Sequence, residues 1–441
     1  MQFIQQVLFL LLAGAAVWLF TKNILQIRRN ILLGRDEDLS NDKGQRWKNV
    51  LLLAFGQKKM FKYPLVAVMH FFIYAGFIII NIEVLEIALD GLLGKHRLFA
   101  APMGRTYAWL INAFEFLAVT VLFACVIFLI RRNILKLRRF RNRELKGFPF
   151  KDANIILFTE IVLMSLFLLM NAADRALQLQ GHASYHDVGS FWFSGMIAPA
   201  FASLDANTLI SIERSAWWLH IIGIFAFLNY LPYSKHLHIM FAFPNAYYMR
   251  LQPQGKMNNM LEIQNEVLYA MEPDKAPAGD AASEQPKKFG AKDIFDLSWK
   301  NVLDAYSCTE CGRCTAACPA NITGKLLSPR KIMMDTRDRA EEIGKNINKN
   351  GEFKDDGKSL LRDYITEEEL RACTSCQACV EECPVGIHPL HIINQLKRYL
   401  VMEESNAPQE WNGMFSNIEN NFAPWKFSPD DRDKWAEEMR S

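Results

Sequence analysis

Five long apolar segments constrain the fold of this 441-residue chain most strongly. They cover about residues 3–26, 64–90, 107–130, 153–173 and 216–234. Each approaches the roughly 20 residues that an α-helix needs to cross a bilayer. Backbone polar groups find no water inside a bilayer, so a spanning segment must be a helix or part of a closed barrel. The pattern therefore predicts a five-helix transmembrane bundle over residues 1–245.

The charge of the connecting loops predicts how this bundle is oriented. Residues 27–63 and 131–151 carry nine Lys and Arg each, whereas residues 91–106 and 174–214 carry three and two. Lys and Arg are enriched in cytoplasmic loops. We therefore expect a multi-pass protein of a bacterial inner membrane, with the N-terminus outside and everything after the fifth segment in the cytoplasm. The first segment follows no basic stretch, so we expect a retained helix and not a signal peptide.

The second half of the chain differs in composition from the first. Residues 271–289 are rich in Pro, Ala and charge, which cannot bury a core, so we expect a flexible linker there. Three parts follow from this division: a linker over 246–289, a soluble helical domain over 290–402 and an aromatic-rich tail over 403–441. The predicted fold class is therefore all-α, with a transmembrane bundle followed by a helical soluble domain.

Three segments of the soluble domain look helical: Leu326–Ala340, Thr366–Cys373 and Leu390–Met402. Thr366 and Glu369 have the spacing of a capping box, in which the two side chains reciprocally bond the first turn of a helix. The net charge of +3 gives no indication of nucleic-acid binding.

Eight of the nine cysteines form two runs, each with the pattern C-x2-C-x2-C-x3-C-P. This is the bacterial [4Fe–4S] pattern, in which the fourth cysteine of each run binds the cluster of the other run. Structural zinc sites use two separated cysteine pairs, which these runs do not resemble. The ninth cysteine, Cys125, lies alone in an apolar segment and is expected to be a small buried hydrophobe. The cluster 1 thiols are then Cys308, Cys311, Cys314 and Cys383, and the cluster 2 thiols are Cys318, Cys373, Cys376 and Cys379.

Four histidines lie in or beside the apolar segments: His70, His220, His236 and His238. On one continuous helix, His220 and His238 would share a face about 27 Å apart, with His236 rotated about 160° away from His220. His70 would lie about 9 Å inside the cytoplasmic face, at the depth of His238. Paired imidazoles on facing helices can hold a b haem. The alternative is that these are interfacial or hydrogen-bonded core histidines. The other five histidines are expected at the surface.

Three glutamates lie within the apolar segments, namely Glu83, Glu115 and Glu160. A carboxylate inside a membrane is costly and is therefore a candidate for function. These side chains could move protons for a quinone site, or they could hydrogen-bond a neighbouring helix. The residues leave both interpretations open.

Residues 1–245 resemble the respiratory nitrate reductase gamma family, on Trp218-Leu219-His220 and on Leu231 to His238. The resemblance implies five helices, an outside N-terminus, quinol oxidation and two b haems. It implies His220 and His238 as ligands to different haems, with His70 as the inner partner. The outer partner position is Ile80 in this chain, which departs from the family pattern. The expectation is therefore one haem, with a second only if another ligand replaces Ile80.

Residues 300–402 resemble the heterodisulfide reductase C family, on Cys308–Pro319, Gly324–Arg330 and Cys373–Gly386. The resemblance implies a helical ferredoxin fold that holds two [4Fe–4S] clusters. Membrane iron–sulfur oxidoreductases of this kind usually continue into CCG domains that carry the reaction. We therefore expect the tail to dock on a separate CCG-domain iron–sulfur or flavin subunit.

These expectations combine into an oxidoreductase subunit that is not catalytic alone. It would link membrane quinone, through b haem, to two cytoplasmic clusters and a separate catalytic subunit. One alternative is a membrane redox sensor or scaffold that carries iron–sulfur clusters. A self-contained reductase is a further alternative, although the sequence shows no nucleotide loop or flavin motif. The catalytic residues, the terminal substrate and the direction of electron flow do not follow from the sequence.

Overall fold

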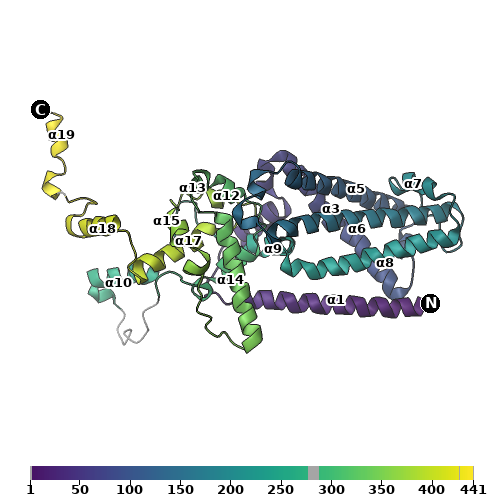
Figure 1. Cartoon of the computed structure of the whole chain (residues 1–441), viewed down its shortest axis with the longest axis horizontal. Helices are drawn as coiled ribbons and strands as arrows, with labels where there is room; N and C mark the ends of the chain where they lie inside the picture. Colours follow the sequence, from purple (N-terminus) through teal and green to yellow (C-terminus); the bar gives the residue numbers. More distant parts are fainter. Residues whose placement is uncertain (1, 277–287, 427, 441) are drawn as a thin grey trace.

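The computed structural model describes residues 2–276, 288–426 and 428–440. Within these ranges the chain is mainly helical, and its β pairing is confined to two isolated bridges. The all-α prediction is therefore confirmed. A bundle of long helices forms one end of the molecule, and short helices arranged around α14 form the other (Figure 1).

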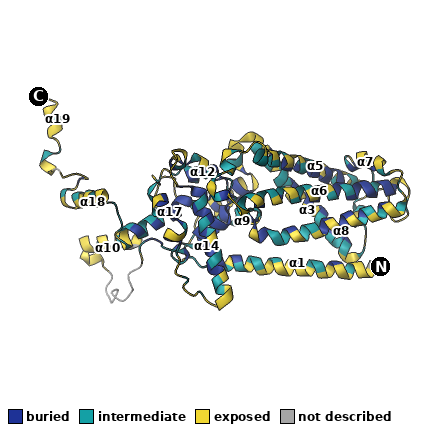
Figure 2. Ribbon diagram, in the orientation of Figure 1, coloured by how far each residue is buried: buried dark blue, intermediate teal, exposed yellow. Residues whose placement is uncertain are grey.

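Four of the described helices are long and apolar enough to cross a membrane. They are α1 (Gln2–Ile31), α3 (Pro64–Leu93), α5 (Thr106–Asn133) and α6 (Phe148–Leu179). Large apolar side chains such as Phe3, Trp18, Leu65 and Trp109 are exposed, and Figure 2 shows α1 exposed along much of its length. Apolar surface of this extent indicates a lipid-facing bundle.

The fifth predicted span corresponds in part to α8 (Ala206–Tyr230), which packs against α6 in the same bundle. It is not among the four apolar helices. Glu213 and Arg214 lie in its first half, and the polar residues Asn229 and Tyr230 close its end. The prediction of five spans is therefore confirmed for four segments, and the fifth stays a prediction.

The chain leaves the helical path directly after Tyr230. Two 3-10 turns, η6 (Leu231–Tyr233) and η7 (Lys235–Leu237), separate α8 from α9 (His238–Tyr247). Ser234 between them is extended, with φ −111° and ψ 148°. The buried carboxylate of Asp152 on α6 accepts hydrogen bonds from Tyr230 Oη at 2.6 Å and Ser234 Oγ at 2.7 Å, which fixes the break. The prediction that His220 and His238 lie on one continuous helix is therefore wrong.

The remaining elements are short. In the first half they are α2 (Lys43–Asn49), η1 (Val50–Phe55), η2 (Lys58–Lys62), α4 (Ala100–Met103), η3 (Arg138–Phe140), η4 (Arg143–Leu145), α7 (Ser194–Ile197) and η5 (Ala198–Phe201). After α9 come α10 (Leu261–Met271), η8 (Pro273–Lys275), η10 (Ile294–Asp296), α11 (Trp299–Tyr306), α12 (Arg313–Ala317), α13 (Pro319–Ile322), α14 (Pro329–Asn350) and η11 (Leu360–Tyr364). They are followed by α15 (Glu367–Arg371), α16 (Ala378–Glu381), α17 (Pro389–Arg398), η12 (Tyr399–Glu403), α18 (Gln409–Asn421), η13 (Pro429–Asp431) and α19 (Lys434–Glu438).

The three helical predictions in the soluble part are confirmed by α14, α15 and the α17–η12 pair, although α14 begins three residues later than predicted and continues to Asn350. The capping box is also confirmed. Thr366 Oγ1 accepts from the amide of Glu369, and the Glu369 carboxylate accepts from the amide of Thr366 at 2.9 Å. Short-range polar signals of this kind survive folding because both partners lie on the same helical turn.

The soluble part is docked directly on the bundle. Ile31 of α1 and Leu231 after α8 share one buried hydrophobic cluster with the residues that surround the cysteine loops. Asn30 Nδ2 donates to Tyr306 Oη at 3.1 Å, and the Asn30 side chain also packs against Gly344 of α14 so closely that a Cβ there would clash. The two parts therefore form one packed unit on either side of the membrane boundary.

The predicted linker is not uniform. Its first residues lie on the soluble part, where Arg250 Nη2 donates to Glu37 Oε2 at 2.9 Å and Asn258 Nδ2 lies 2.8 Å from His391 Nε2. His391 was expected at the surface but is buried. The next residues form α10, and residues 277–287, which include most of the Pro- and Ala-rich stretch, lie outside the described residues.

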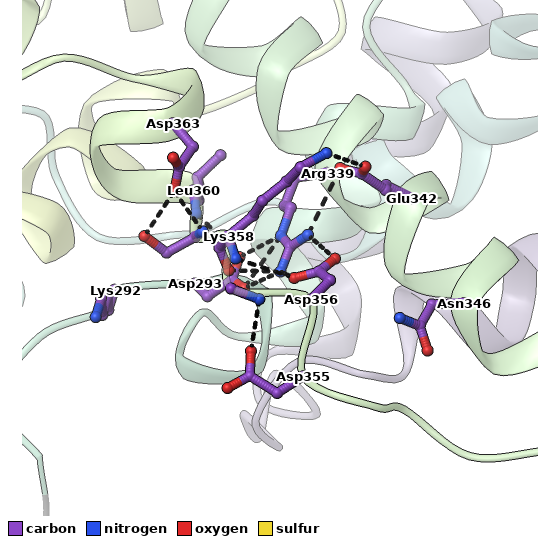
Figure 3. Close-up of polar contacts among 12 residues, drawn as sticks. Lys292, Asp293, Arg339, Glu342, Asn346, Asp355, Asp356, Lys358, Leu360 and Asp363 are labelled. Atoms are coloured by element: carbon purple, nitrogen blue, oxygen red, sulfur yellow. Dashed lines mark hydrogen bonds and ion pairs between the residues drawn. The ribbon is translucent and has the colours of Figure 1, made fainter. Parts of the chain in front are cut away.

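Arg339 of α14 joins the start of the soluble part to the loop that follows α14 (Figure 3). Its fully buried guanidinium donates to Asp293 Oδ2 at 2.8 Å, to Asp356 Oδ2 at 2.6 Å and to the Lys358 carbonyl at 2.8 Å. The Asp293 carboxylate in turn accepts from the amide of Leu360 at 3.1 Å. One cation thus holds three separate segments around α14.

Candidate functional site

The four cluster 2 thiols line one small cavity. Cys318 comes from the start of α13, whereas Cys373, Cys376 and Cys379 come from the loop and helix that follow α15. The fold therefore brings the last cysteine of the first run to the first three cysteines of the second run. Their role as cluster ligands stays a prediction.

The cluster 1 thiols are also close enough to influence one another. Burial raises the pKa of the Cys308 thiol to about 12, and the neighbouring Glu310, Cys311 and Cys383 add to the rise. Burial and the neighbouring Cys311 raise the pKa of Cys383 to about 11. Thiols with these pKa values keep their protons at neutral pH unless a metal centre replaces them. The site therefore fits a cationic iron centre better than four free thiols.

The two cysteine runs fold alike. Glu310 and Gly312 in the first run have φ values of 53° and 74°, and the matching residues of the second run, Ser375 and Gln377, have φ values of 57° and 64°. Left-handed residues at alternate positions curl each loop. Gly312 has a second reason to be glycine, because a Cβ there would clash with the guanidinium of Arg330. The repeated backbone conformation matches the repeated spacing of the sequence.

No three His, Cys, Asp or Glu side chains in the described ranges converge as the ligands of one metal ion do. A [4Fe–4S] cube makes a different demand, because each of its four thiolates binds its own iron atom. Four thiols per site are the donor set that such a cluster requires.

Glu310 connects the first cysteine loop to the end of the bundle. Its buried carboxylate forms ion pairs with Lys235 and, at 2.9 Å, with Arg337. Burial alone would raise the pKa of Glu310, but these two cations outweigh burial and hold the pKa below its usual value. Lys235 Nζ also donates to the Pro149 carbonyl at 2.6 Å. One lysine therefore joins α6 to the loop between Cys308 and Cys311.

A second, larger cavity of about 360 Å³ lies between the bundle and the first cysteine loop. We call it the histidine cavity, because His70, His236 and His238 all line it. Apolar side chains from α3, α5, α6 and α9 form most of its wall, and Cys311 lies on its rim. The structure thus brings His70 and His238 together, as their predicted depths required.

The Nδ1 atoms of both predicted haem ligands are already engaged. His70 Nδ1 lies 3.0 Å from Gln57 Oε1, and His238 Nδ1 lies 3.0 Å from the Lys235 carbonyl. A hydrogen bond to one ring nitrogen fixes the ring and its tautomer and leaves the other nitrogen for a metal. The cavity therefore offers two oriented imidazoles whose Nε2 atoms are available to a haem iron.

His236 is a residue that sequence reasoning placed incorrectly. Its ring lies 5.7 Å from the ring of His238, and its Nε2 is buried with no hydrogen-bond partner in the described part of the chain. An unbroken helix would have turned it away from the cavity. The turns at Leu231–Leu237 bring it to the cavity instead, and no local sequence signal other than Pro232 announces that break.

His220 lies elsewhere, and it is not on the wall of the histidine cavity. It is buried on α8, where its Nδ1 lies 3.0 Å from the Leu163 carbonyl. Its neighbours Trp217 and Ile221 pack in one hydrophobic cluster with Ile80, the position where an outer haem partner would stand. Its role as a haem ligand stays a prediction.

The three glutamates have different surroundings. Glu115 accepts from the amides of Phe193 at 2.8 Å and Ser194 at 3.2 Å, so it holds the loop before α7. Glu160 lies on the wall of the histidine cavity. Glu83 is buried away from it, with one carboxylate oxygen lacking a hydrogen-bond partner among the described residues. The structure therefore favours a structural role for Glu115 and leaves Glu160 beside the histidines.

Comparisons with known proteins agree with the thiol geometry. Residues 307–387 match the family of 4Fe-4S dicluster domains, which supports iron–sulfur clusters as cofactors. The chain is 27% identical, over 98% of its length, to the "Probable iron-sulfur-binding oxidoreductase FadF" of Bacillus subtilis. It is 27% identical over 92% of its length to the "EtfAB:quinone oxidoreductase" of Syntrophomonas wolfei. The homologues of this chain are iron–sulfur oxidoreductases.

The soluble part has relatives of its own. Over 27% of this chain, it is 33% identical to 60% of the C component of the ferredoxin/F(420)H(2)-dependent CoB-CoM heterodisulfide reductase of Methanosarcina acetivorans. The chain spans 60% and 56% of the lengths of the Bacillus and Syntrophomonas relatives. No solved structure matches it. The resemblance of residues 1–245 to the nitrate reductase gamma family stays a prediction.

Proposed function

We propose that this chain is a membrane electron-transfer subunit of an oxidoreductase, carrying electrons between quinone and a cytoplasmic partner through a b haem and two [4Fe–4S] clusters. The histidine cavity carries this proposal, because His70, His238 and Cys311 line the same space. A haem held by the two imidazoles would have a cluster 1 thiol at the rim of its own pocket. Electrons could then pass from the membrane to the soluble part without a moving domain.

The chain's own residues would orient these carriers. The bound haem would supply a one-electron centre within the bundle. His70 and His238 would hold it, with their rings fixed by Gln57 and by the Lys235 carbonyl. The cluster 1 and cluster 2 thiols would hold the two clusters in crossed sets, so the clusters would be neighbours. Glu160 is the carboxylate on the cavity wall that could accept a proton released when quinol is oxidised.

Quinone as the membrane partner has two supports. One is the lipid-facing bundle, and the other is the name of the EtfAB:quinone oxidoreductase relative. The basic loops 27–63 and 131–151 lie at the end of the bundle that carries the soluble part, which supports a cytoplasmic location for both clusters.

The tail is the part we propose for docking the catalytic subunit. It extends away from the soluble part in Figure 1 and carries exposed large side chains on α18 and beyond it. These are Trp411, Phe415, Ile418, Phe422, Trp425 and Trp435. Buried aromatic anchors commonly dominate the binding energy of protein interfaces. A CCG-domain iron–sulfur or flavin subunit is the partner we propose for this surface.

A reduced-minus-oxidised haem spectrum of the purified chain tests the proposal. We expect one b haem in the wild type, none in His70→Ala or His238→Ala, and an unchanged amount in His186→Ala, which alters an exposed loop histidine. Iron and acid-labile sulfide should stay the same in all four proteins, because the cysteine loops are untouched. A wild type without haem, or a normal spectrum in His70→Ala, would refute the membrane half of the proposed path.

A further inference from the structure

Four arginines gather around the histidine cavity. Arg131 and Arg132 end α5, Arg139 lies in η3 and Arg313 begins α12, and all four line the cavity. They come from three elements and from both parts of the molecule. Their meeting is therefore a product of the docking between the bundle and the soluble part, and it is invisible in the sequence.

These arginines have no carboxylate partner within the described residues. Arg313 Nη1 donates to the Lys59 carbonyl at 3.2 Å, and Arg139 lies over the ring of Phe140 at 4.8 Å. The Nε atom of Arg139 is buried and has no hydrogen-bond partner in the described part of the chain. A buried guanidinium donor without an acceptor is costly, so this arrangement indicates that an acceptor binds from outside the chain.

The nearest carboxylate cannot serve as that acceptor. Glu310 also lines the cavity, but Lys235 and Arg337 already neutralise it. The arginines instead act on one another. Burial lowers the pKa of Arg139, and the neighbouring charges of Arg131 and Arg313 lower it further. A group of like charges at a low-dielectric boundary is stable only with a bound anion.

The shape of the cavity indicates what kind of anion binds. Behind the arginines the wall is apolar, with Phe77, Phe128 and Ile156, and it continues to the two oriented imidazoles. A ligand that fills this space must have a large apolar body, a metal or acceptor atom for imidazole nitrogen, and an anionic edge. Haem has all three, since its two propionates are carboxylates on one edge of the ring.

We propose that Arg131, Arg139 and Arg313 form the carboxylate site for the haem propionates, at the side of the cavity that faces cluster 1. This inference rests on the proposed function, because it requires haem between His70 and His238. Guanidinium groups bind carboxylates by charge-assisted, often bidentate hydrogen bonds. The phosphate of an anionic lipid would offer the same chemistry to these arginines, and the experiment separates the two sources.

The test compares Arg139→Gln and Arg131→Gln with Arg138→Gln in the full chain, purified in detergent. Arg138 precedes Arg139 in the same turn but is exposed and does not line the cavity, so it is the matched control. Haem dissociation is followed as transfer to excess apomyoglobin, and the haem midpoint potential by redox titration. Bound phospholipid is measured by mass spectrometry. Cluster iron and the electron paramagnetic resonance signals of the clusters report on folding.

We expect haem to dissociate about tenfold faster from each cavity variant, which corresponds to one lost charge-assisted hydrogen bond. The midpoint potential should fall, because removing a nearby positive charge favours the ferric state. The control should match the wild type, and cluster signals should be unchanged in all three variants. If Arg139→Gln does not fold, Arg131→Gln carries the same test.

Two results would overturn the inference. Wild-type haem affinity and potential in both cavity variants would refute the arginine site while leaving the haem itself in place. A loss of bound anionic lipid with unchanged haem would show that the arginines serve a phosphate instead. A wild type without haem would refute the proposed function together with this inference, so the failures are distinguishable.

Discussion

Replacing Lys235 by methionine tests the contact that joins the bundle to the first cysteine loop. The change keeps most of the apolar stem and removes the ammonium, so Glu310 loses one of its two cations. The Lys235 side chain is 10% exposed and the Glu310 side chain 2%, so water cannot replace the lost partner. Breaking a buried ion pair costs about 3–5 kcal/mol. Because Arg337 still contacts Glu310 at 2.9 Å, we expect a loss of about 2–3 kcal/mol in the free energy of unfolding.

The assay is urea unfolding of the full chain in detergent, followed by the loss of iron–sulfur absorbance. Lys146→Met, at an exposed lysine before α6, is the control and should match the wild type. Adding Glu310→Gln to Lys235→Met should recover part of the lost stability, because no uncompensated carboxylate then remains. A Lys235→Met protein within about 0.5 kcal/mol of the wild type would refute the reasoning, since exposed substitutions have effects of that size.

Three further predictions concern the soluble part and the tail. Cys318→Ser should abolish the resonance signal of cluster 2 and lower the iron content from about eight to about four per chain; loss of the cluster 1 signal alone would contradict the crossed ligand sets. Arg339→Leu leaves two carboxylates without their cation and should lower the unfolding free energy by about 3 kcal/mol, measured by urea titration. Lys349→Leu on the same helix should have no effect, and equal effects of the two changes would contradict this account. Truncation after Ser405 should abolish co-purification of the partner subunit while both cluster signals stay normal; undiminished co-purification would refute the docking role of the tail.

Much of this molecule could be predicted because its signals are local. Three of the four thiols for each cluster lie within seven consecutive residues, so their spacing alone indicates the cofactor. The capping box at Thr366 and Glu369 and the four apolar helices follow for the same reason. Cofactor chemistry and lipid contact leave marks on short stretches of chain, and those marks need no tertiary structure to be interpreted.

The path of the chain after α8 could not be predicted in this way. Asp152 on α6 captures Tyr230 and Ser234 from across the bundle, and this contact decides where the helix ends. The break brings His236 to the cavity and places His238 beside His70 without the shared helical face that periodicity suggested. A long-range hydrogen bond competes with helix continuation, and nothing in the local sequence reports its strength.

The sequence by itself determined the cofactor chemistry, the helical class and the division into an apolar and a soluble part, because spacing and composition act along the chain. Only the tertiary structure decided which side chains share a cavity. Arg131, Arg139 and Arg313 meet His70 and Cys311 because the soluble part docks on the bundle through Asn30, Tyr306 and Gly344. Such a meeting depends on the packing of surfaces far apart in sequence, and close packing, unlike periodicity, is a property of the whole fold.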